Sequence, residues 1–527
     1  MSRLRWGEAV RLALFGLALA CAGCGAPRVE RSAEIERFQQ EGQARLAALG
    51  LDPARPLTLA DCEAIALKNN LEYRTRLLQS QLQDEQVRLA LTGFLPRGDV
   101  GYLRKTRSNE PLVSVFGGSA IAMEDQSQSA FSFHTLIPIF DFGNTYFAWQ
   151  IAKDRRTQDR LATVRARQQL LRDIRIRYAR HAAEIRQEQL WMTAVKAAQE
   201  LLKVAESYER EGIGVAADTA QVKATLADAA KELLLARSRV QETKLLLAQT
   251  LSLPAHVEFK VDPALPALPE PLTPGRLLQL EEHALRARPE LWIQDLERHV
   301  AANAVRKEIS GFFPRVDGMV NFDWTSLSQQ VNPAFWTFGA SVAHSLLDSG
   351  SKVYRLEMAK KGGKVEAERA LLLSLGILYE VDLAALQVAK AHQNVLASRE
   401  VVAAYEELVR QIQSRYREGL EVGADLAKAI ARAHAAILNV DRAQTDYQTA
   451  WYDLRAAAVP DEKPMEGGSE APPSTPPSGK NDTEGSTPPR DRASDPGRPD
   501  QGPVGEEESA EASGDAEPPA QEGGTQP

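Results

Sequence analysis

The chain has 527 residues, of which 43% are hydrophobic, 25% charged and only 6% aromatic. That aromatic share is low for the three or four compact cores expected at about 150 residues per domain. Alanine, leucine, arginine, glutamate and glutamine dominate instead, which indicates long helices. Three cysteines are too few for a disulfide framework. The formal net charge of −8 argues against a nucleic-acid partner.

The amino terminus predicts export and lipid anchoring. Basic side chains in residues 1–11 precede an apolar run over residues 12–20, which is the order of a secretory signal peptide. A cysteine after small residues then resembles a bacterial lipobox, which implies acylation of Cys24, or alternatively of Cys21. The same C-A-G-C segment also fits a C-x-x-C redox pair, which its place at the end of a signal peptide disfavours. Acylation by two or more chains anchors a protein stably, and Gly25 after Cys24 implies sorting to the outer membrane.

A helix is predicted from Thr58 to the turn at Pro96. Thr58, followed by Asp61 and Glu63, is typical of an N-cap with an acidic first turn. Apolar residues then recur at helical spacing, and Pro96 should end the helix.

Two very long helices are predicted further along the chain. No proline interrupts residues 142–207, so about 66 residues at about 1.5 Å each make a rod of roughly 100 Å. A second helix is expected from about 351 to 415, although Gly362-Gly363 should bend or fray it near its start. Such helices have no compact core of their own, so they must pair with others. The small side chains that permit close packing are Ala194, Ala197, Ala198 and Ala205.

Strands are predicted where apolar and polar residues alternate, as in Val320-Asn-Phe-Asp-Trp324. The segments lie at about 97–107, 128–139, 315–325 and 334–345. Each is long enough to cross a bilayer as a tilted strand of about 9 to 11 residues. No apolar run of 18 residues follows the signal, so we expect no transmembrane helix. The alternative is a pair of soluble hairpins packed on a helical body.

The number of strands has a consequence for assembly. Four strands cannot close a barrel, and an open sheet edge in lipid leaves backbone groups without partners. Spanning strands therefore require several copies of the chain. Two copies give eight strands around a filled interior, whereas three give twelve and leave a conduit.

An internal duplication organises the mature chain. Phe94-Leu-Pro-Arg97 recurs as Phe312-Phe-Pro-Arg315, and residues 208–218 recur as residues 415–425. Two copies of one unit, each of about 200 residues, are therefore expected. The predicted parts are a signal peptide (1–23), a periplasmic linker (24–57), a first repeat (58–252), a proline-rich connector (253–274), a second repeat (275–459) and a tail (460–527).

The tail is predicted to be disordered. From Asp461 onward it holds 16 acidic and 5 basic residues, 13 prolines and 10 glycines, and no Ile, Leu, Phe, Tyr or Trp. Its net charge of −11 leaves +3 for the preceding 460 residues, so the body is close to neutral. The tail is either a dispensable extension or a solvated tether.

The order and spacing of several motifs resemble the TolC-like outer-membrane efflux proteins. The motifs are residues 58–70, Gly93-Phe-Leu-Pro-Arg97, Pro138-Ile-Phe-Asp-Phe-Gly143 and Tyr416-Arg-Glu-Gly419 through Asp425. The resemblance covers residues 58–458. It implies an α+β membrane protein, a homotrimer with a 12-stranded β-barrel in the outer membrane and an α-helical barrel in the periplasm. It further implies a passive exit duct that an inner-membrane pump reaches through a periplasmic adaptor protein.

Two turns receive specific roles from this resemblance. It implies that the turns form the periplasmic tip where adaptors dock, and that Asp425 forms a carboxylate ring at the pore constriction. The residues concerned are Gly212, Ala216, Asp218, Gly419, Gly423 and Asp425. Their physical chemistry alone offers simpler roles, since glycine permits the turns and Asp218 can cap the returning helix. Glu421 and Lys428 depart from the family pattern, in which some members carry a basic residue and a second acid.

No catalytic, cofactor or metal site is expected. The eight histidines show no H-E-x-x-H spacing, and no G-x-x-x-x-G-K-[ST] loop or G-x-S-x-G elbow occurs. Energy for transport must therefore come from a partner. The competing prediction is a lipid-anchored periplasmic coiled-coil scaffold without a pore.

Overall fold

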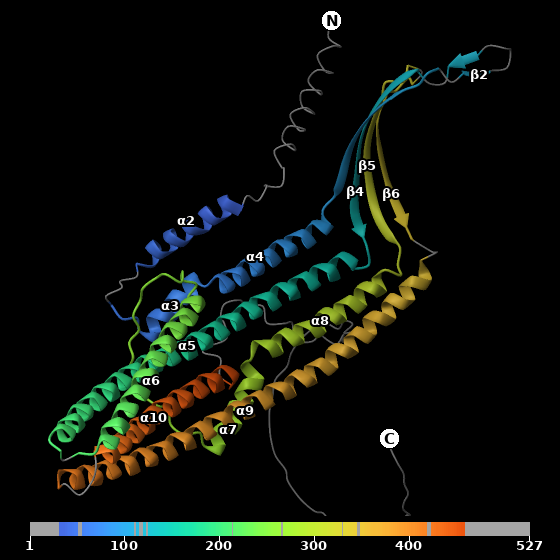
Figure 1. Cartoon of the computed structure of the whole chain (residues 1–527). Helices are drawn as coiled ribbons and strands as arrows, with labels where there is room; N and C mark the ends of the chain where they lie inside the picture. Colours follow the sequence, from blue (N-terminus) through green and yellow to red (C-terminus); the bar gives the residue numbers. More distant parts are fainter. Residues whose placement is uncertain are drawn as a thin grey trace, which may run out of the picture. The chain divides into compact units, whose positions relative to one another are not determined.

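The computed structural model describes residues 31–50, 55–109, 112–114, 120–122, 125–212, 214–264, 267–328, 330–344, 348–418 and 423–458 (Figure 1). Cys21, Cys24, Gly419 and the tail lie outside the described residues. The chain divides into one unit over Met1–Met465 and another over Glu466–Pro527, and every element described here belongs to the first. A helix, α2 (Arg31–Leu49), occupies part of the segment expected to be a linker.

The helix expected from Thr58 to Pro96 is in fact two helices, α3 (Leu59–Asn69) and α4 (Leu71–Leu91). The predicted cap is confirmed, because the Thr58 hydroxyl accepts from the backbone N–H of Asp61 and the Asp61 carboxylate accepts from that of Thr58. The break at Asn70 was not expected. The Asn70 amide accepts from the N–H of Tyr73 at 2.8 Å and donates to the carbonyl of Thr250 at 2.7 Å, so a distant segment fixes the bend.

The long helices are confirmed as α5 (Asn144–Arg210, 67 residues) and α9 (Ser349–Arg417, 69 residues). Each is followed by a shorter helix packed against it, α6 (Ala216–Thr250) on α5 and α10 (Gly423–Ala458) on α9. Two further helices, α7 (Pro274–Ala287) and α8 (Pro289–Ser310), precede the second half of the sheet. The expected fraying at Gly362-Gly363 is wrong, because α9 continues through both residues.

The four predicted strands are confirmed as β1 (Arg97–Thr106), β4 (Ser127–Phe140), β5 (Arg315–Thr325) and β6 (Ala334–Ala343). They form one antiparallel sheet in the order β1-β4-β5-β6, so the central pair joins one strand of each repeat. A two-stranded sheet of β2 (Leu112–Ser114) and β3 (Ala120–Ala122), which was not predicted, lies between β1 and β4 in the chain.

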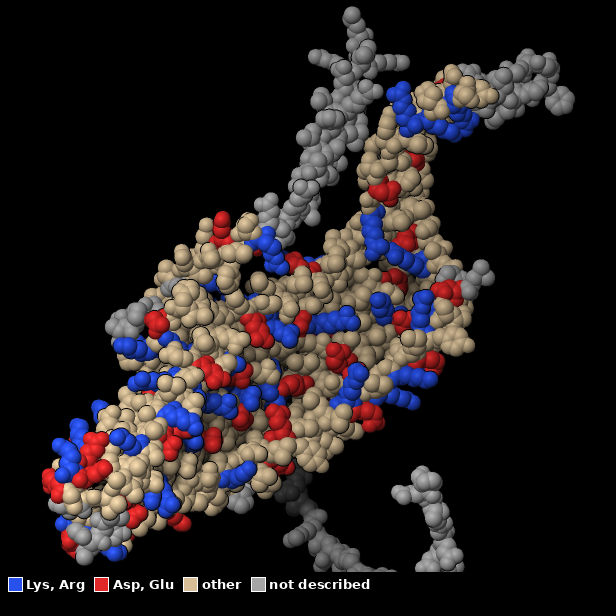
Figure 2. Space-filling model, viewed as in Figure 1, with Lys and Arg blue, Asp and Glu red and all other residues tan. Residues whose placement is uncertain are grey.

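The strand register separates an apolar face of the sheet from a polar one. Val100, Phe133, Phe322 and Trp336 stand opposite one another across all four strands, and the last two rings lie 5.0 Å apart. The next row toward the helices carries polar residues instead: Asp99, His134, Asn321 and Thr337. The surface of the strands shows few charged side chains compared with the helices (Figure 2). The apolar face therefore has the composition of a lipid-facing surface.

Two clusters of buried side chains hold the helices together. One joins α3, α5 and α6 around Ile174, Leu247 and Leu251, and the other joins α7, α9 and α10 around Val381 and Tyr447. The extended proline-rich connector is part of the first cluster, since Phe259 and Val261 are buried in it.

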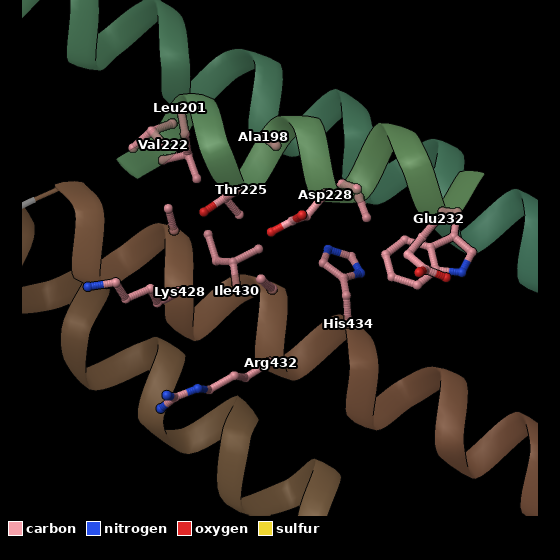
Figure 3. A pocket seen from close by; sticks show the side chains of 15 residues that line it. Ala198, Leu201, Val222, Thr225, Asp228, Glu232, Lys428, Ile430, Arg432 and His434 are labelled. Atoms are coloured by element: carbon pink, nitrogen blue, oxygen red, sulfur yellow. The ribbon is translucent and has the colours of Figure 1, made fainter. Parts of the chain in front are cut away.

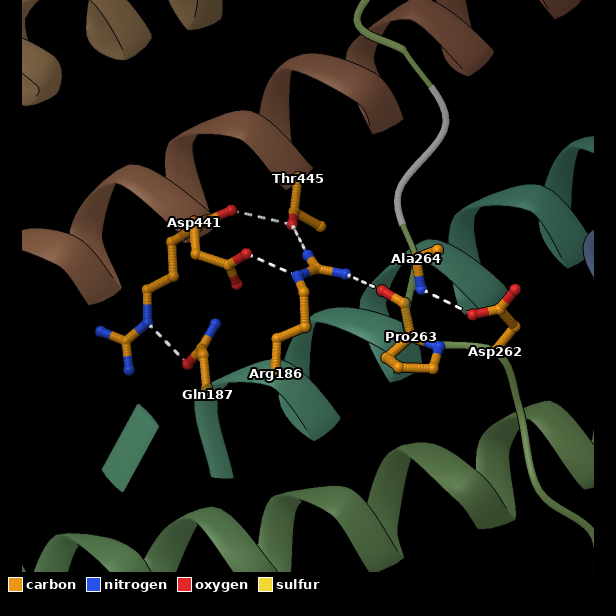
Figure 4. A network of polar contacts seen from close by, with 8 residues as sticks. Arg186, Gln187, Asp262, Pro263, Ala264, Asp441 and Thr445 are labelled. Atoms are coloured by element: carbon orange, nitrogen blue, oxygen red, sulfur yellow. Dashed lines mark hydrogen bonds and ion pairs between the residues drawn. The ribbon is translucent and has the colours of Figure 1, made fainter. Parts of the chain in front are cut away.

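A polar network fastens the connector to both halves of the chain (Figure 4). The Arg186 guanidinium on α5 pairs with the Asp441 carboxylate on α10 at 2.7 Å, and donates to the carbonyl of Pro263 at 2.7 Å. It also donates to the Thr445 hydroxyl at 3.3 Å. The connector therefore packs as part of the body and is not a free linker.

Helix α9 differs from expectation in its composition. It contains an 18-residue window that is apolar and long enough to cross a membrane. This window holds at most two charged residues, and most of it is exposed. The expectation that no helix crosses the membrane stays a prediction, because this window passes a test of length and composition alone. Length and composition alone do not distinguish a spanning helix from one that another protein surface covers.

Candidate functional site at the tip of the helical hairpins

The first turn, between α5 and α6, owes its shape to glycine. Gly212 adopts a φ of +73°, in the left-handed region that favours glycine. The N–H of Gly214 then donates to the carbonyl of Tyr208 at 2.9 Å. A Cβ at Gly214 would lie 3.1 Å from the backbone nitrogen of Glu209, a tight contact that requires the neighbouring backbone to shift by a few tenths of an ångström.

The returning helix α6 starts at Ala216 without a side-chain cap. Val215 is its N-cap residue and makes no side-chain hydrogen bond to the helix. Asp218 lies in the first turn, where a carboxylate interacts favourably with the helix dipole. The expected capping role of Asp218 is therefore wrong, since capping needs the side chain one position before the helix begins.

The second turn brings Gly423 against a tyrosine. A Cβ at Gly423, the first residue of α10, would lie 3.6 Å from the Tyr416 ring, an ordinary van der Waals distance. Gly419, the other glycine predicted for this turn, lies outside the described residues. Tyr416 itself sits in the last turn of α9.

A pair of tyrosines joins the two hairpins at their ends. The ring centroids of Tyr208 and Tyr416 lie 6.4 Å apart, and their planes are inclined by 39°. Burial, followed by the charge and hydrogen bond of Tyr208, raises the pKa of the Tyr416 hydroxyl. This contact places both turns at one end of the helices. We call this end the tip: the described parts of residues 208–219 and 416–428.

The sequence reveals the tyrosine pair only indirectly. The offset of 207 that aligns Asp218 with Asp425 puts Tyr208 one position away from Tyr416. Helix packing nevertheless brings the two rings together. Contacts between hairpins depend on the direction in which each side chain leaves its helix, and not on whether the two residues occupy equivalent positions in the two repeats.

The predicted constriction residue Asp425 is paired with a lysine. The Lys428 ammonium lies 3.6 Å from the Asp425 carboxylate, and both side chains are 46% exposed. Such an exposed pair within one helical turn contributes little stability. Its consequence is electrostatic, because the positive charge of Lys428 partly offsets the negative charge of Asp425. The sequence identified Lys428 only as a residue that departs from the family pattern.

A cavity of about 270 Å³ lies behind the tip, between α5, α6 and α10 (Figure 3). Asp228 from α6 and His434 from α10 extend into it, and Trp191 from α5 also lines it. Burial lowers the pKa of His434. The Trp191 Nε1 and His434 Nδ1 atoms have no hydrogen-bond partner among the described protein atoms. Water or another polar group can therefore be accommodated there.

The tip is far from the sheet along the chain. Helix α5 begins four residues after β4 ends, and its 67 residues at about 1.5 Å each separate the sheet from the tip by roughly 100 Å. Within the described ranges, no three His, Cys, Asp or Glu side chains gather in a way that could hold a metal ion. The arrangement is one of long helices that connect a sheet at one end to two tight turns at the other.

Comparison with known proteins identifies the family. The model of the outer membrane efflux protein family matches residues 64–252 and again 280–458, which together make up more than half of the chain. The chain belongs to the outer membrane efflux protein family. The double match also confirms the internal duplication. Membership of this family places the protein in the outer membrane.

Solved structures show the same fold as this outer membrane efflux protein. The Campylobacter jejuni CmeC outer membrane channel has a TM-score of 0.66 at 14% identity, covering 76% of this chain and 85% of that one. The outer membrane protein VceC of Vibrio cholerae has a TM-score of 0.64 at 16% identity, covering 76% and 95%. The Neisseria gonorrhoeae MtrE channel in its open state has a TM-score of 0.61 at 17% identity, covering 76% and 88%. A search of curated sequences finds no match.

Proposed function

We propose that this protein is the outer-membrane exit duct of a tripartite efflux or type I secretion system. The observation that carries the proposal is the four-stranded sheet, which is apolar on one face and is joined to helices of 67 and 69 residues. The sheet supplies the wall of a pore through lipid, and the helices continue that wall into the periplasm. The duct is passive, so a partner pump supplies the energy.

The pore is completed by three copies of the chain. Among the described residues, strands β1 and β6 each pair on one side only, so the sheet has two free edges. An open edge in lipid leaves N–H and C=O groups without partners, and closure with neighbouring copies removes that cost. Three copies give twelve strands, which is wide enough for a conduit.

The tip is the place where a periplasmic adaptor docks. The Tyr208–Tyr416 contact and the glycine turns present both hairpins at one end of the helices. In the same assembly Asp425 faces the pore, and three copies of the Asp425–Lys428 pair form a ring of mixed charge at the constriction. Acylation of Cys24 after removal of residues 1–23 anchors the mature protein to outer-membrane lipid.

The remaining parts of the chain support this duct. Residues 24–57 lead from the anchor to the first repeat at 58–252, the connector at 253–274 packs into the body, and the second repeat follows at 275–459. The acidic tail at 460–527 serves as a solvated extension.

Single-channel recording after reconstitution into a planar bilayer tests the proposal. The full-length protein should migrate as a heat-modifiable trimer and give discrete conductance steps. A monomeric protein without conductance would instead support the competing function of a periplasmic scaffold.

A substitution at the constriction tests the role of Asp425. Asp425→Asn leaves three uncompensated Lys428 charges in the ring, so the ratio of cation to anion permeability should fall by about 2- to 3-fold. The matched control is Asp173→Asn, which removes a half-exposed carboxylate from the middle of α5. An unchanged ratio of cation to anion permeability in Asp425→Asn would show that Asp425 does not lie at the constriction. That outcome would leave the proposed channel itself unaffected.

A further inference from the structure

The polar face of the sheet carries a histidine between two carboxylates from neighbouring strands. In the register, Asp99 on β1 stands opposite His134 on β4, which stands opposite Asn321 on β5. Asp323 lies two residues from Asn321 and therefore on the same face. We call Asp99, His134 and Asp323 the lumenal triad.

The two ring nitrogens of His134 face different carboxylates. Nε2 lies 3.3 Å from the Asp323 carboxylate, and Nδ1 lies 3.9 Å from the Asp99 carboxylate. The His134 side chain is 46% exposed and that of Asp323 is 35% exposed, so the triad is accessible to water. Because the carboxylates lie on opposite sides of the ring, they do not converge on one point as metal ligands do.

The other charged residues of this face lie farther along the strands. Arg97 is one row away from Asp99 toward the helices, and Arg315 is paired with Asp317 at 2.8 Å near the same end of the sheet. Lys105 lies close to the opposite end of β1. His134's own strand carries no other charged residue on this face, and β6 presents Thr337 in the same row as His134.

The triad occupies the face that a pore would present to water. The adjacent row of Val100, Phe133, Phe322 and Trp336 belongs to the apolar face, which contacts lipid in a barrel. The alternating side chains of the polar face then line the interior. Three copies of the chain place three imidazoles and six carboxylates in one band of the lumen.

We propose that the lumenal triad sets the charge preference of the barrel interior and that protonation of His134 adjusts it with pH. This inference rests on the proposed trimeric pore. Neutral His134 leaves the carboxylates of Asp99 and Asp323 uncompensated, so the band attracts cations. Protonated His134 places a positive charge between them and weakens that attraction. Loss of that proton restores the attraction, so the cation preference of the band rises as the pH rises.

A purely structural role for the triad has a different signature. Cross-strand pairs of opposite charge stabilise a sheet, and such a role affects assembly or melting but gives no histidine-dependent change in ion selectivity. Reversal potentials in a salt gradient, measured from pH 5 to 8 on the full-length reconstituted channel, separate the two roles. Potassium chloride is the probe.

The wild-type ratio of potassium to chloride permeability should rise by about 2- to 3-fold between pH 5 and 8. His134→Asn should remove most of this rise while retaining the conductance. His134→Lys should hold the ratio at the low value throughout, because its charge persists over the range. Asp99→Asn and Asp323→Asn should lower the ratio at pH 8, and they test the triad if the His134 variants do not assemble.

The control is His344→Asn, an exposed histidine just beyond β6, which should leave the pH dependence unchanged. A pH-dependent ratio that persists in His134→Asn, or that disappears in His344→Asn, would overturn the inference and leave the channel intact. A wild-type ratio independent of pH would do the same. Absence of any conductance in the wild type would instead overturn the proposed function, and the inference with it.

Discussion

His181 shows how burial of one titratable side chain links the helical body to pH. It lies on α5 with only 3% of its surface exposed, and its Nδ1 atom is 2.9 Å from the Thr243 hydroxyl on α6. Burial, and secondarily the charge of Lys244, lowers the pKa of His181 to about 4. The folded protein therefore keeps this imidazole neutral at pH values at which the unfolded chain protonates it.

We expect His181 to destabilise the fold in mild acid. Because the pKa of His181 is lower in the folded protein than in the unfolded chain, protons bind preferentially to the unfolded chain as the pH falls from about 6.5 toward about 4. The stability that is fully present above about pH 6.5 is lost over this range, and the free energy of unfolding should be lower by about 2 kcal/mol at pH 5. His181→Gln should remove this part of the pH dependence. Urea denaturation of the full-length protein in detergent, followed by circular dichroism at pH 7.5 and 5, measures it. The same substitution at the exposed His256 serves as control, and an unchanged pH dependence in His181→Gln would contradict the assignment.

At the level of single residues, the sequence predicted hydrogen bonds between near neighbours in the chain better than contacts between distant segments. The Thr58–Asp61 cap was predictable because both partners lie within one helical turn. Asn70 was not, since its amide bonds the carbonyl of Thr250, 180 residues away. The tyrosine pair at the tip and the lysine beside Asp425 likewise depend on how the folded hairpins meet.

Glycines at two places in the helical elements should respond to substitution with opposite sign. Gly212→Ala forces a side chain into a φ of +73°, which should destabilise the turn by about 1 kcal/mol. Gly362→Ala lies inside α9 with no atom within 4 Å of the added Cβ, so it should stabilise the helix by up to about 1 kcal/mol.

Hydrogen exchange at the Gly214 amide reports on the turn, because that N–H donates to Tyr208. Exchange there should quicken in Gly212→Ala and remain unchanged in Gly362→Ala. The same sign of stability change in both variants would show that backbone conformation does not control the turn.

The secondary structure of the repeats was largely predictable from sequence. Strands of 10 to 14 residues and helices near 70 residues carry long periodic patterns of apolar residues, and these patterns can be recognised from the sequence alone. Strands β2 and β3, of three residues each, are too short to show a pattern. The break between α3 and α4 was missed because the helical pattern continues across it.

At the scale of the molecule, helix α9 exposes an apolar stripe on the side away from its buried contacts. The large side chains of this stripe are between 53% and 71% exposed: Leu371, Leu372, Leu375, Tyr379, Leu383 and Leu386. Val381 and Val388, on the opposite side, are fully buried against the rest of the chain. We expect the exposed side of α9 to be covered by a neighbouring copy in the proposed trimer, because a helix that is apolar on both sides favours burial on both.

Leu375→Glu should weaken the proposed trimer, because it places a charge in each of three apolar contacts. Sedimentation of the detergent-solubilised protein should show a shift toward monomer. Gln393→Glu is the matched control, since it lies 18 residues, or five helical turns, along the same exposed face and is already polar. Persistence of the trimer in Leu375→Glu would show that this stripe lies outside the contact between copies.

The duplication was predictable from sequence at this scale, because paired landmarks recur at nearly constant offsets. The role of the connector was not, since six prolines predict only an extended path and give no sign that Phe259 and Val261 join the core. The apolar stripe of α9 is not evident from the sequence, because charged residues interrupt the run of apolar residues.

The free edges of β1 and β6 have a consequence for biogenesis. If the chain assembles as the proposed trimer, a newly exported copy carries two rows of unsatisfied backbone groups until other copies join it. Its sheet thus matures only through encounters between molecules, and the yield of finished pores depends on the local concentration of unassembled chains.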